Sequence, residues 1–258
     1  MAIPRVIPVL LLKNKGLVKS VKFKDYRYVG DPINAVRIFN EKEVDELMFL
    51  DIEASKTGHA PRLDVLQQIA SECFMPLGYG GGVSTIDHIK SLIQCGIEKI
   101  SINSAALERL DFIKSACDQF GSSTIVGAID VKKNLWGKYH VFNHRSNKIL
   151  ELDPLAFAES LQKAGVGELF INIVDRDGIM EGYDFEFIKK ITAEIDVPVI
   201  ACGGCGSIND IDKVINYSNA SAAAAGSFFV FHGKHKAVLI TYPEYGVLEN
   251  MFSHRGTD

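Results

Sequence analysis

Acidic, amide and glycine residues follow several apolar runs of this chain, and the same kinds of residue recur in its second half. Carboxylates can act as general acids and bases, glycines let a backbone approach a ligand closely, and N–H groups at helix starts bind anions. Because the two halves match, the sequence predicts two phosphate cradles that hold one ligand with a phosphate at each end. The first cradle comprises Gly81, Gly82, Asn103 and Ser104, and the second comprises Gly178, Gly203, Gly204, Gly226 and Ser227.

One position breaks the match between the halves. The segment Val9-Leu10-Leu11-Leu12 corresponds to Ala128-Ile129-Asp130-Val131, so Leu11 is the counterpart of Asp130. A positioned acid or base contributes about 100- to 10,000-fold to a rate, and leucine can neither donate nor accept a proton. One half of the chain thus offers a carboxylate, Asp130, where the other half offers only hydrocarbon.

The cysteines and histidines could form a redox pair or a metal site, but their spacing favours neither. An odd count of five cysteines in a chain large enough to fold without disulfides favours reduced thiols. Cys202 and Cys205 have the spacing of a redox pair, but they end a buried run deep in the chain, which favours a tight loop. A structural zinc site needs four Cys or His ligands, and neither this pair nor His232 with His235 has a second pair at ligand spacing. We expect no metal and no cofactor.

Composition is that of an ordinary globular protein. With 258 residues, 47% hydrophobic and 23% charged, the chain can bury one large core. A formal net charge of -4 provides no basic field for nucleic acid or anionic lipid, and no apolar run has the length of a membrane span. The N-terminus lacks the features of a signal peptide. We therefore expect a cytoplasmic protein that binds neither nucleic acid nor membrane.

Short β-rich apolar runs alternate with amphipathic stretches of helical period, which is the pattern of successive βα units on a parallel sheet. Together with the internal repeat, this alternation predicts a closed (β/α)8 TIM barrel that forms a single domain over residues 1–258. A doubly wound open sheet is the alternative, but it would not require the second half to repeat the first. The expected strands are Arg5–Leu12, Glu46–Ile52, Met75–Tyr79, Lys99–Asn103, Thr124–Val131, Glu168–Val174, Val197–Ala201 and Ala222–Phe229. The expected helices are Pro32–Asn40, Arg62–Cys73, Ile86–Cys95, Asp111–Phe120, Pro154–Ala164, Phe185–Glu194 and Asn209–Asn216.

In such a barrel the chemistry belongs at the carboxyl ends of the strands, where the repeated motifs lie. An aromatic stretch after the fifth strand is expected to form a hairpin or lid beside them. Its residues include Trp136, Tyr139, His140 and Phe142.

Six motifs near strand ends are shared with a known family. They are Leu50-Asp51-Ile52, Gly80-Gly81-Gly82, Lys99-Ile100-Ser101-Ile102-Asn103, Ala128-Ile129-Asp130, Asp175-Arg176-Asp177-Gly178 and Ala201-Cys202-Gly203-Gly204. On these motifs the chain resembles HisF, the cyclase subunit of imidazole glycerol phosphate synthase, over nearly its whole length. The resemblance implies a glutamine amidotransferase in which a HisH-like glutaminase, bound as a heterodimer, releases ammonia. The ammonia would travel along the barrel axis to a bisphosphorylated substrate at the mouth.

The resemblance also implies roles for single residues. In the family, two aspartates at the ends of strands one and five serve as general acid and base, and here Asp130 keeps one position while Leu11 replaces the other. The family's Thr-Ser pair on strand six is matched by Asn172 and Ile173. Asp51 or Asp177 could stand in for the missing carboxylate, although neither lies on the same strand end. The candidate substrate contacts are Asp51, Asn172, Asp177 and Lys19, the last of which matches a flexible substrate-covering loop of the family.

Charged residues begin four of the expected strands at the other end of the barrel. Charges at strand starts are commonly solvated, but these four match the ring that the family places at its ammonia entrance. Arg5 and Leu11 are six residues apart, so both lie on the same side of the first strand. The expected ammonia gate comprises Arg5, Glu46, Lys99 and Glu168.

The chain is also similar to HisF-like paralogues found beside surface-polysaccharide genes, which share Leu10-Leu11-Leu12-Lys13 and Gly30-Asp31-Pro32-Ile33-Asn34-Ala35. This resemblance implies a role with a HisH-like glutaminase and a separate amidating enzyme in converting an acetamido sugar to an acetamidino sugar. One alternative is a cyclase of histidine biosynthesis, which converts ammonia and PRFAR to imidazole glycerol phosphate and AICAR. The other is a non-catalytic docking subunit that activates the glutaminase.

Overall fold

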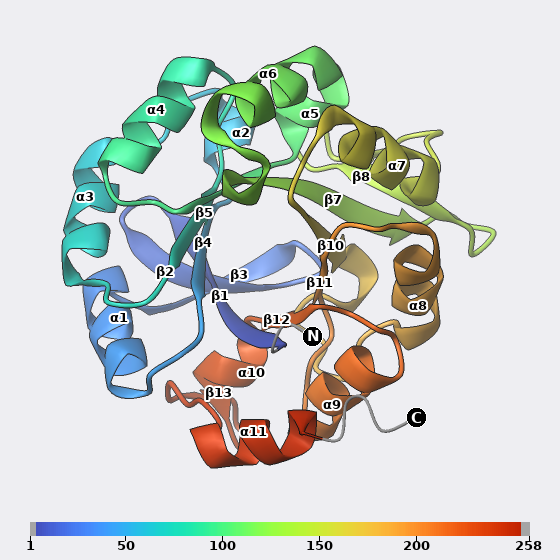
Figure 1. The fold of residues 1–258 in the computed structure, drawn as a ribbon. Helices are drawn as coiled ribbons and strands as arrows, with labels where there is room; N and C mark the ends of the chain where they lie inside the picture. The colour runs from blue at the N-terminus through green and yellow to red at the C-terminus, as the bar shows by residue number, and fades with distance from the viewer. Residues whose placement is uncertain (1–3, 254–258) are drawn as a thin grey trace.

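The computed structural model describes residues 4–253, and these form a closed barrel of parallel strands surrounded by helices (Figure 1). Consecutive barrel strands are hydrogen-bonded in chain order, and the pairing of β12 with β1 closes the ring. This arrangement confirms the predicted (β/α)8 barrel. The barrel strands are β1 (Arg5–Lys13), β4 (Leu47–Asp51), β5 (Leu77–Gly80), β6 (Lys99–Ile102), β7 (Ile125–Lys133), β10 (Glu168–Ile173), β11 (Val199–Cys202) and β12 (Ala222–Ala225).

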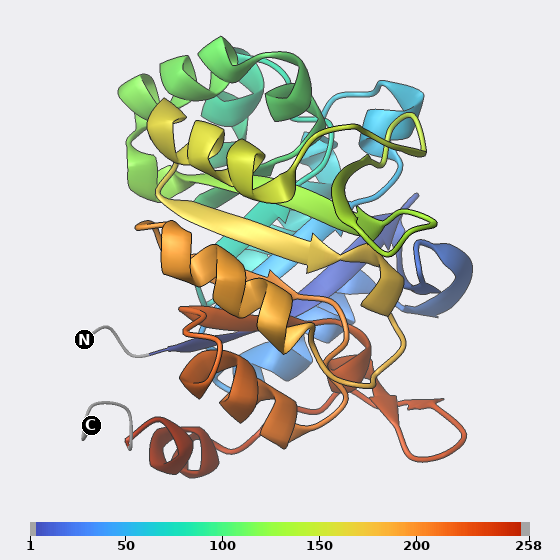
Figure 2. The ribbon, with the colours of Figure 1, turned by 90° about the vertical axis from the view of Figure 1, so that its right-hand side faces the viewer.

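Amphipathic helices cover the outside of the barrel, as Figures 1 and 2 show. Several begin at residues that favour helix starts. Asp31 accepts a hydrogen bond from the Asn34 amide, and Ser207 forms a capping box with Asp210. The outer helices are α1 (Pro32–Glu41), α3 (Leu63–Glu72), α4 (Ile86–Gln94), α6 (Leu110–Phe120), α7 (Pro154–Ala164), α8 (Phe185–Glu194), α9 (Ile208–Asn216) and α11 (Tyr245–Phe252). A short 3-10 helix, η1 (Ser122–Thr124), precedes β7.

The hydrophobic core has two layers, because successive side chains of a strand point to opposite faces. Val6, Leu10 and Leu12 of β1 pack outward against the helices. Ile7 and Val9 pack inside the barrel, and Leu11 lies against this inner cluster. The other inner residues are Met48, Val126, Ala128, Phe170, Ile200, Cys202, Ala222 and Ala224, with Leu50 partly buried beside them.

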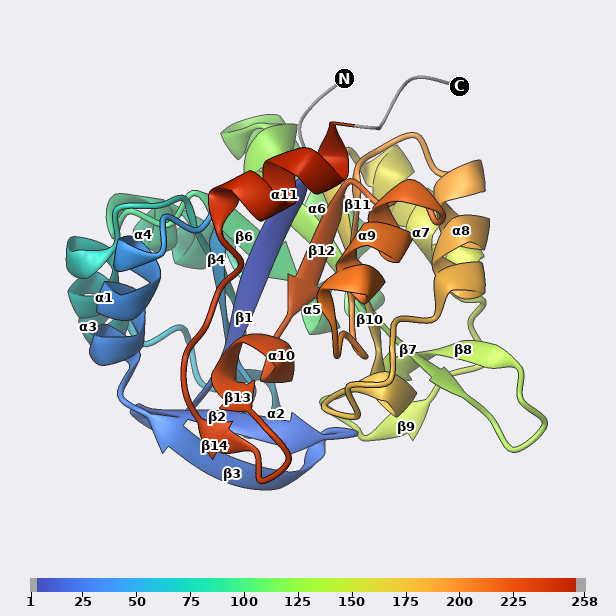
Figure 3. The ribbon, with the colours of Figure 1, turned by 90° about the horizontal axis from the view of Figure 1, so that it is seen from below.

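Hairpins and short helices gather at the carboxyl ends of the strands, which we call the mouth. Figure 3 shows the β2–β3 and β13–β14 hairpins at this end and α11 at the opposite end, which we call the floor. A hairpin follows the first strand of each half, since β2 pairs with β1 and β8 pairs with β7. The mouth elements are β2 (Gly16–Val21), β3 (Lys24–Gly30), α2 (Ala54–Thr57), α5 (Ser104–Glu108), β8 (Tyr139–Asn143), β9 (Lys148–Ile149), η2 (Val174–Arg176), α10 (Ser227–Val230), β13 (Phe231–His232) and β14 (Ala237–Val238).

Most predicted boundaries lie within two residues of the observed ones. The last strand is an exception, because β12 ends at Ala225 and Phe229 belongs to the short helix α10. The predicted hairpin around Trp136 is present, with Phe142 buried and Trp136 exposed. His232 lies in β13 and His235 in the exposed turn that follows. Within residues 4–253, no helix has both the length and the apolar character needed to cross a membrane.

Candidate functional site

A cavity of about 270 Å³ lies at the mouth of the barrel. Side chains from both halves line it, and most of the polar residues singled out from the sequence are among them. Asp130 and Leu11 face this same space from β7 and β1. The other polar candidates that line it are Lys19, Asp51, Asn103, Ser104, Asn172, Asp177 and Ser227.

Asp130 is held by two amide side chains. Asn103 Nδ2 donates to one carboxylate oxygen at 2.9 Å, and Asn172 Nδ2 donates to the other at 3.1 Å. Burial raises the pKa of Asp130 from 3.8 to about 7, and the nearby charge of Asp177 acts in the same direction against the two hydrogen bonds. A carboxyl group with this pKa can both give and take a proton near neutral pH.

Leu11 has an apolar neighbour where Asp130 has a polar one. Leu11 lies opposite Leu50 in the β1–β4 ladder, and Asp130 lies opposite Asn172 in the β7–β10 ladder. The two pairs occupy equivalent places in the two halves. The half that carries Leu11 therefore presents two hydrocarbon side chains where the other half presents a carboxyl group and an amide.

Two further carboxylates that line the cavity, Asp51 and Asp177, have partners of their own. Asp51 Oδ1 accepts hydrogen bonds from the amides of Glu53 and Ala54 at 3.1 Å, and its Oδ2 accepts from Arg62 at 2.9 Å. Asp51 is 5% exposed, and its carboxylate links the amides at the start of α2 to Arg62.

Asp177 anchors the β2–β3 hairpin. Its Oδ2 accepts from Ser20 Oγ at 2.7 Å and from the Phe23 amide at 3.3 Å. Burial raises the pKa of this carboxyl group, while its hydrogen bonds and Lys19 oppose the shift. Because hydrogen bonds hold both carboxylates in place, neither Asp51 nor Asp177 takes the place of a carboxylate at position 11.

Lys19 is on strand β2 and only 3% exposed, in contrast to its expected position in a flexible loop. The strand turns it inward, and its ammonium group donates to the Val9 carbonyl. A Cβ atom added at Gly226 would come within 2.6 Å of Lys19 Nζ, so the ammonium group lies directly beside that glycine. Burial lowers the pKa of Lys19 to about 8, although Asp177 opposes the shift. The hairpin therefore places the buried Lys19 ammonium group beside Gly226 of the second predicted phosphate cradle.

The first predicted cradle is assembled at the cavity wall. Gly81 and Gly82 have φ of 126° and 69°, and a Cβ atom would lie 2.5 Å from the Asp51 carbonyl oxygen at the first position and 2.5 Å from the His59 carbonyl oxygen at the second. Only glycine fits both the backbone angle and the space. Asn103 and Ser104 line the cavity next to them, where β6 passes into α5.

Only part of the second predicted cradle lines the cavity. Gly226 and Ser227 line the cavity at the end of β12. The remaining three glycines lie where loops cross closely, since a Cβ on each would approach a carbonyl oxygen to 2.7 Å or less. The contacts are Gly178 with Ser20, Gly203 with Ile173 and Gly204 with Gly182. These glycines shape the loops around the cavity.

The sequence reasoning missed several cavity residues, among them two from the second half. His144 and Arg145 follow β8 and reach the cavity from the hairpin of the second half. The His144 ring packs edge-on against Phe23 at 5.1 Å, which joins the two mouth hairpins. Burial lowers the pKa of His144, so the neutral ring is favoured. The aromatic stretch singled out at residues 136–142 was the available signal, but it stopped short of these two.

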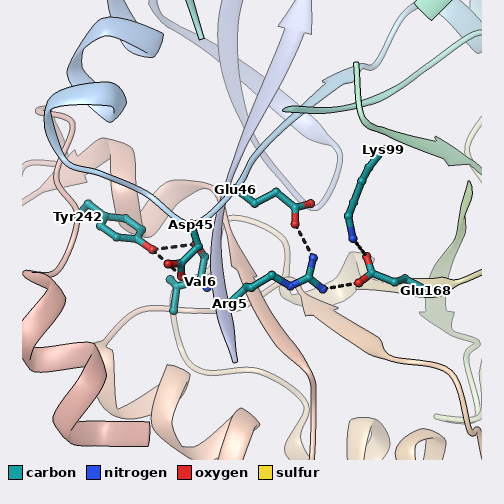
Figure 4. Close-up of polar contacts among 7 residues, drawn as sticks. All are labelled: Arg5, Val6, Asp45, Glu46, Lys99, Glu168 and Tyr242. Carbon is teal, nitrogen blue, oxygen red and sulfur yellow. Dashed lines mark hydrogen bonds and ion pairs between the residues drawn. The ribbon is translucent and has the colours of Figure 1, made fainter. Parts of the chain in front are cut away.

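The four predicted gate residues meet at the floor (Figure 4). Arg5 contacts Glu46 and Glu168, each at 2.5 Å, and Lys99 Nζ contacts Glu168 at 2.6 Å. Glu46 is 1% exposed and Glu168 is 8% exposed, so these charges are turned away from solvent. Among residues 4–253, Glu46 Oε1 is buried without a hydrogen-bond partner. This floor ring of Arg5, Glu46, Lys99 and Glu168 therefore keeps one free acceptor.

The cysteines are free thiols in the described part of the chain. Burial raises the pKa of Cys202, and it raises the pKa of Cys205 to about 12, so both stay protonated at neutral pH. Within residues 4–253, no group of three or more His, Cys, Asp and Glu residues has a geometry that could hold a metal ion.

The family model described as "Histidine biosynthesis protein" matches residues 5–236. "Putative imidazole glycerol phosphate synthase subunit hisF2" of Pseudomonas aeruginosa is 52% identical over 245 residues, covering 95% of this chain and 98% of that protein. The similarly named hisF3 protein of Vibrio vulnificus is 48% identical over 240 residues, 93% of this chain and 92% of its own length. A HisF protein of Leptospira interrogans, also named as putative, is 44% identical over 250 residues, 96% and 98% of the two chains. The chain thus belongs to the histidine biosynthesis protein family and is a HisF-like paralogue within it.

Proposed function

We propose that this chain is the ammonia-channelling subunit of a glutamine amidotransferase, and that its acceptor differs from the histidine-pathway substrate. A HisH-like glutaminase binds at the floor as the second half of a cytoplasmic heterodimer. Ammonia passes through the floor ring and along the barrel axis to the mouth. The observation that carries the proposal is the presence of the complete floor ring together with Leu11 at the mouth.

The mouth supports altered chemistry. Ring closure by the family's route needs two proton-transfer groups on opposite sides of the substrate, and here Asp130 faces Leu11 across the cavity. Leu50 beside Leu11 makes that side apolar. Loss of one positioned acid or base raises a barrier by about 3 to 5 kcal/mol.

The floor and the barrel interior suit a small neutral nucleophile. The unpartnered Glu46 Oε1 can accept a hydrogen bond from an N–H group that enters the ring. Above the ring, the inner cluster is apolar and contains small residues such as Ala128, Ala222 and Ala224. Such a path opposes passage of the ammonium ion, because an unpaired charge is strongly disfavoured in an apolar interior, and it tolerates neutral ammonia.

Binding of a phosphorylated small molecule forms part of the proposal. Gly81, Gly82, Asn103 and Ser104 line one side of the cavity, while Gly226 and Ser227 line another beside the Lys19 ammonium group. Glycine backbone and a lysine side chain are groups that bind phosphate well. The second cradle would also depend on the loops that are shaped by Gly178, Gly203 and Gly204.

The acceptor proposed here is a surface-polysaccharide sugar, amidated by a separate enzyme that receives the ammonia. Leu11 lies within Leu10-Leu11-Leu12-Lys13, one of the two stretches on which the resemblance to the polysaccharide-associated paralogues rests. The hydrocarbon side chain of Leu11, where the family places an aspartate, supports a mouth that has changed its task.

A histidine-pathway cyclase is the second candidate. Family membership favours it, and so does Asp130, whose pKa of about 7 suits acid–base work. Leu11 opposes it.

Co-expression with a HisH-type glutaminase tests the proposal. We expect a stable heterodimer on size-exclusion chromatography and about tenfold or greater stimulation of glutamine hydrolysis without any bisphosphate ligand. Lys99→Ala should reduce the stimulation, whereas Lys114→Ala, which removes an exposed lysine of the outer helix α6, should not. Failure to bind or to stimulate would overturn the proposal. In cells, Asp130→Asn separates an enzyme from a pure conduit, since a conduit keeps its pathway flux.

A further inference from the structure

The backbone of Val6 meets an unusual set of partners at the floor. The Arg5 amide bonds to the Ser221 carbonyl beside β12, so by the alternation of a parallel strand the Val6 amide and carbonyl face β4. The observed β1–β4 pairing starts only at Val9 and Met48. The Val6 groups therefore have no β4 strand partner and must be satisfied in another way.

Asp45 and Tyr242 supply the missing partners. The Val6 amide donates to Asp45 Oδ2 at 2.8 Å, and the Tyr242 hydroxyl lies 2.9 Å from the Val6 carbonyl and 3.2 Å from Asp45 Oδ2. Because one hydroxyl carries one proton, Tyr242 shares it between two acceptors. We call the three residues Val6, Asp45 and Tyr242 the floor clasp (Figure 4).

The floor clasp is adjacent in sequence to the floor ring. Arg5 precedes Val6, and Glu46 follows Asp45, so the clasp joins the two backbone segments that carry the Arg5–Glu46 ion pair. In Figure 4 the clasp lies on one side of β1 and the ring on the other. The clasp thus holds the Arg5–Val6 segment at a fixed distance from the Asp45–Glu46 segment. It does so from outside the barrel and does not occupy the barrel axis.

Tyr242 is itself held firmly. Its ring packs against Phe229 with centroids 5.4 Å apart, and the preceding Thr241 amide donates to the Phe229 carbonyl at 2.9 Å. Phe229 is 1% exposed. The segment after β14 thereby brings the hydroxyl to the floor on a rigid support.

We propose that Tyr242 and Asp45 are positioning residues for the Arg5–Glu46 side of the floor ring. Their role in ammonia delivery rests on the proposed function, but the positioning itself does not. Removal of the Tyr242 hydroxyl leaves the Val6 carbonyl short of a donor, lets the start of β1 move relative to Asp45, and loosens the guanidinium contact with Glu46.

The test follows the Arg5 guanidinium protons by NMR in the full-length chain under native conditions. In Tyr242→Phe we expect their exchange with water to rise by about tenfold, because the ion pair opens more often. Tyr217→Phe is the matched control, since Tyr217 also donates to a carboxylate, that of Glu186 on the outer helix α8, at 2.6 Å. It should change the exchange by less than about twofold.

Variants of Asp45 provide a second part of the NMR test. Asp45→Asn retains an oxygen for the Val6 amide and should resemble the wild type, whereas Asp45→Ala should match Tyr242→Phe. Unchanged Arg5 exchange in both Tyr242→Phe and Asp45→Ala, with the variants folded by circular dichroism, would overturn the inference.

The heterodimer with the glutaminase distinguishes this inference from the function on which it rests. We expect Tyr242→Phe to lower the stimulated kcat for glutamine by about threefold or more while KM stays unchanged. If Arg5→Ala itself leaves the stimulation intact, the proposed function of the ring fails, and the NMR result still decides whether the floor clasp positions it.

Discussion

Leu11 and Asp130 face one cavity from equivalent strands of the two half-barrels. Their ladder partners differ in the same sense, because Leu50 lies opposite Leu11 and Asn172 lies opposite Asp130. One half thus presents two hydrocarbon side chains where the other presents a carboxyl group and an amide. This difference separates the mouth of this chain from a site with two acid–base groups.

Asp130 should make stability depend on pH. Its pKa is raised from 3.8 unfolded to about 7 folded, so the folded protein holds the proton more tightly. The resulting stabilisation is fully present below the unfolded pKa and is lost as pH rises through the folded one. We expect the wild type to lose on the order of 3 kcal/mol relative to Asp130→Asn between pH 4 and pH 7. Urea unfolding of both proteins across this range measures the difference, and parallel pH profiles would contradict it.

Lys19 should bind phosphate in a pH-dependent way. Its pKa of about 8 leaves it charged at pH 7 and largely neutral at pH 9.5. We expect Lys19→Met to weaken inorganic phosphate binding by about fivefold at pH 7 and by much less at pH 9.5. Isothermal titration calorimetry measures both, with Lys24→Met as an exposed control from the same hairpin. Equal affinities of wild type and Lys19→Met at pH 7 would show that Lys19 makes no phosphate contact.

Asp51 should matter for stability more than for chemistry. Asp51→Ala removes the acceptor of two amides and leaves Arg62 without its carboxylate. We expect the free energy of unfolding to fall by about 3 kcal/mol. The exposed Asp64→Ala on α3 should change it by less than about 0.5 kcal/mol. Chemical denaturation distinguishes the two, and a loss below about 1 kcal/mol for Asp51→Ala would argue against a structural role.

The barrel could be predicted from the sequence because its signals are local and repeated. Apolar runs of β-rich residues alternate with helices whose starts carry caps such as Asp31 and Ser207. The end of the last strand was wrong because Phe228 and Phe229 continue the apolar pattern of Ala222–Ala225 into α10. Hydrophobicity alone does not distinguish a strand from a buried short helix.

The sequence predicted that Asp130 and Asn103 lie at the mouth, because both come at the carboxyl ends of expected strands, and both line the cavity. Tertiary contacts decided the remainder. Lys19 is buried because β2 pairs with the extended end of β1, and Asp177 anchors the same hairpin through Ser20. Tyr242 meets Asp45 across 197 residues of sequence, so no local pattern could reveal the floor clasp.

Restoring the carboxylate at position 11 tests most directly whether that position separates this chain from a cyclase. Purified wild type, Leu11→Asp and Leu11→Asn are each incubated with PRFAR and saturating ammonium chloride, and formation of imidazole glycerol phosphate and AICAR is measured. We predict no measurable product from wild type or Leu11→Asn, and a rate about 100-fold or more above background from Leu11→Asp. Sustained turnover by the wild type would contradict the proposed change of acceptor and identify the chain as a working cyclase.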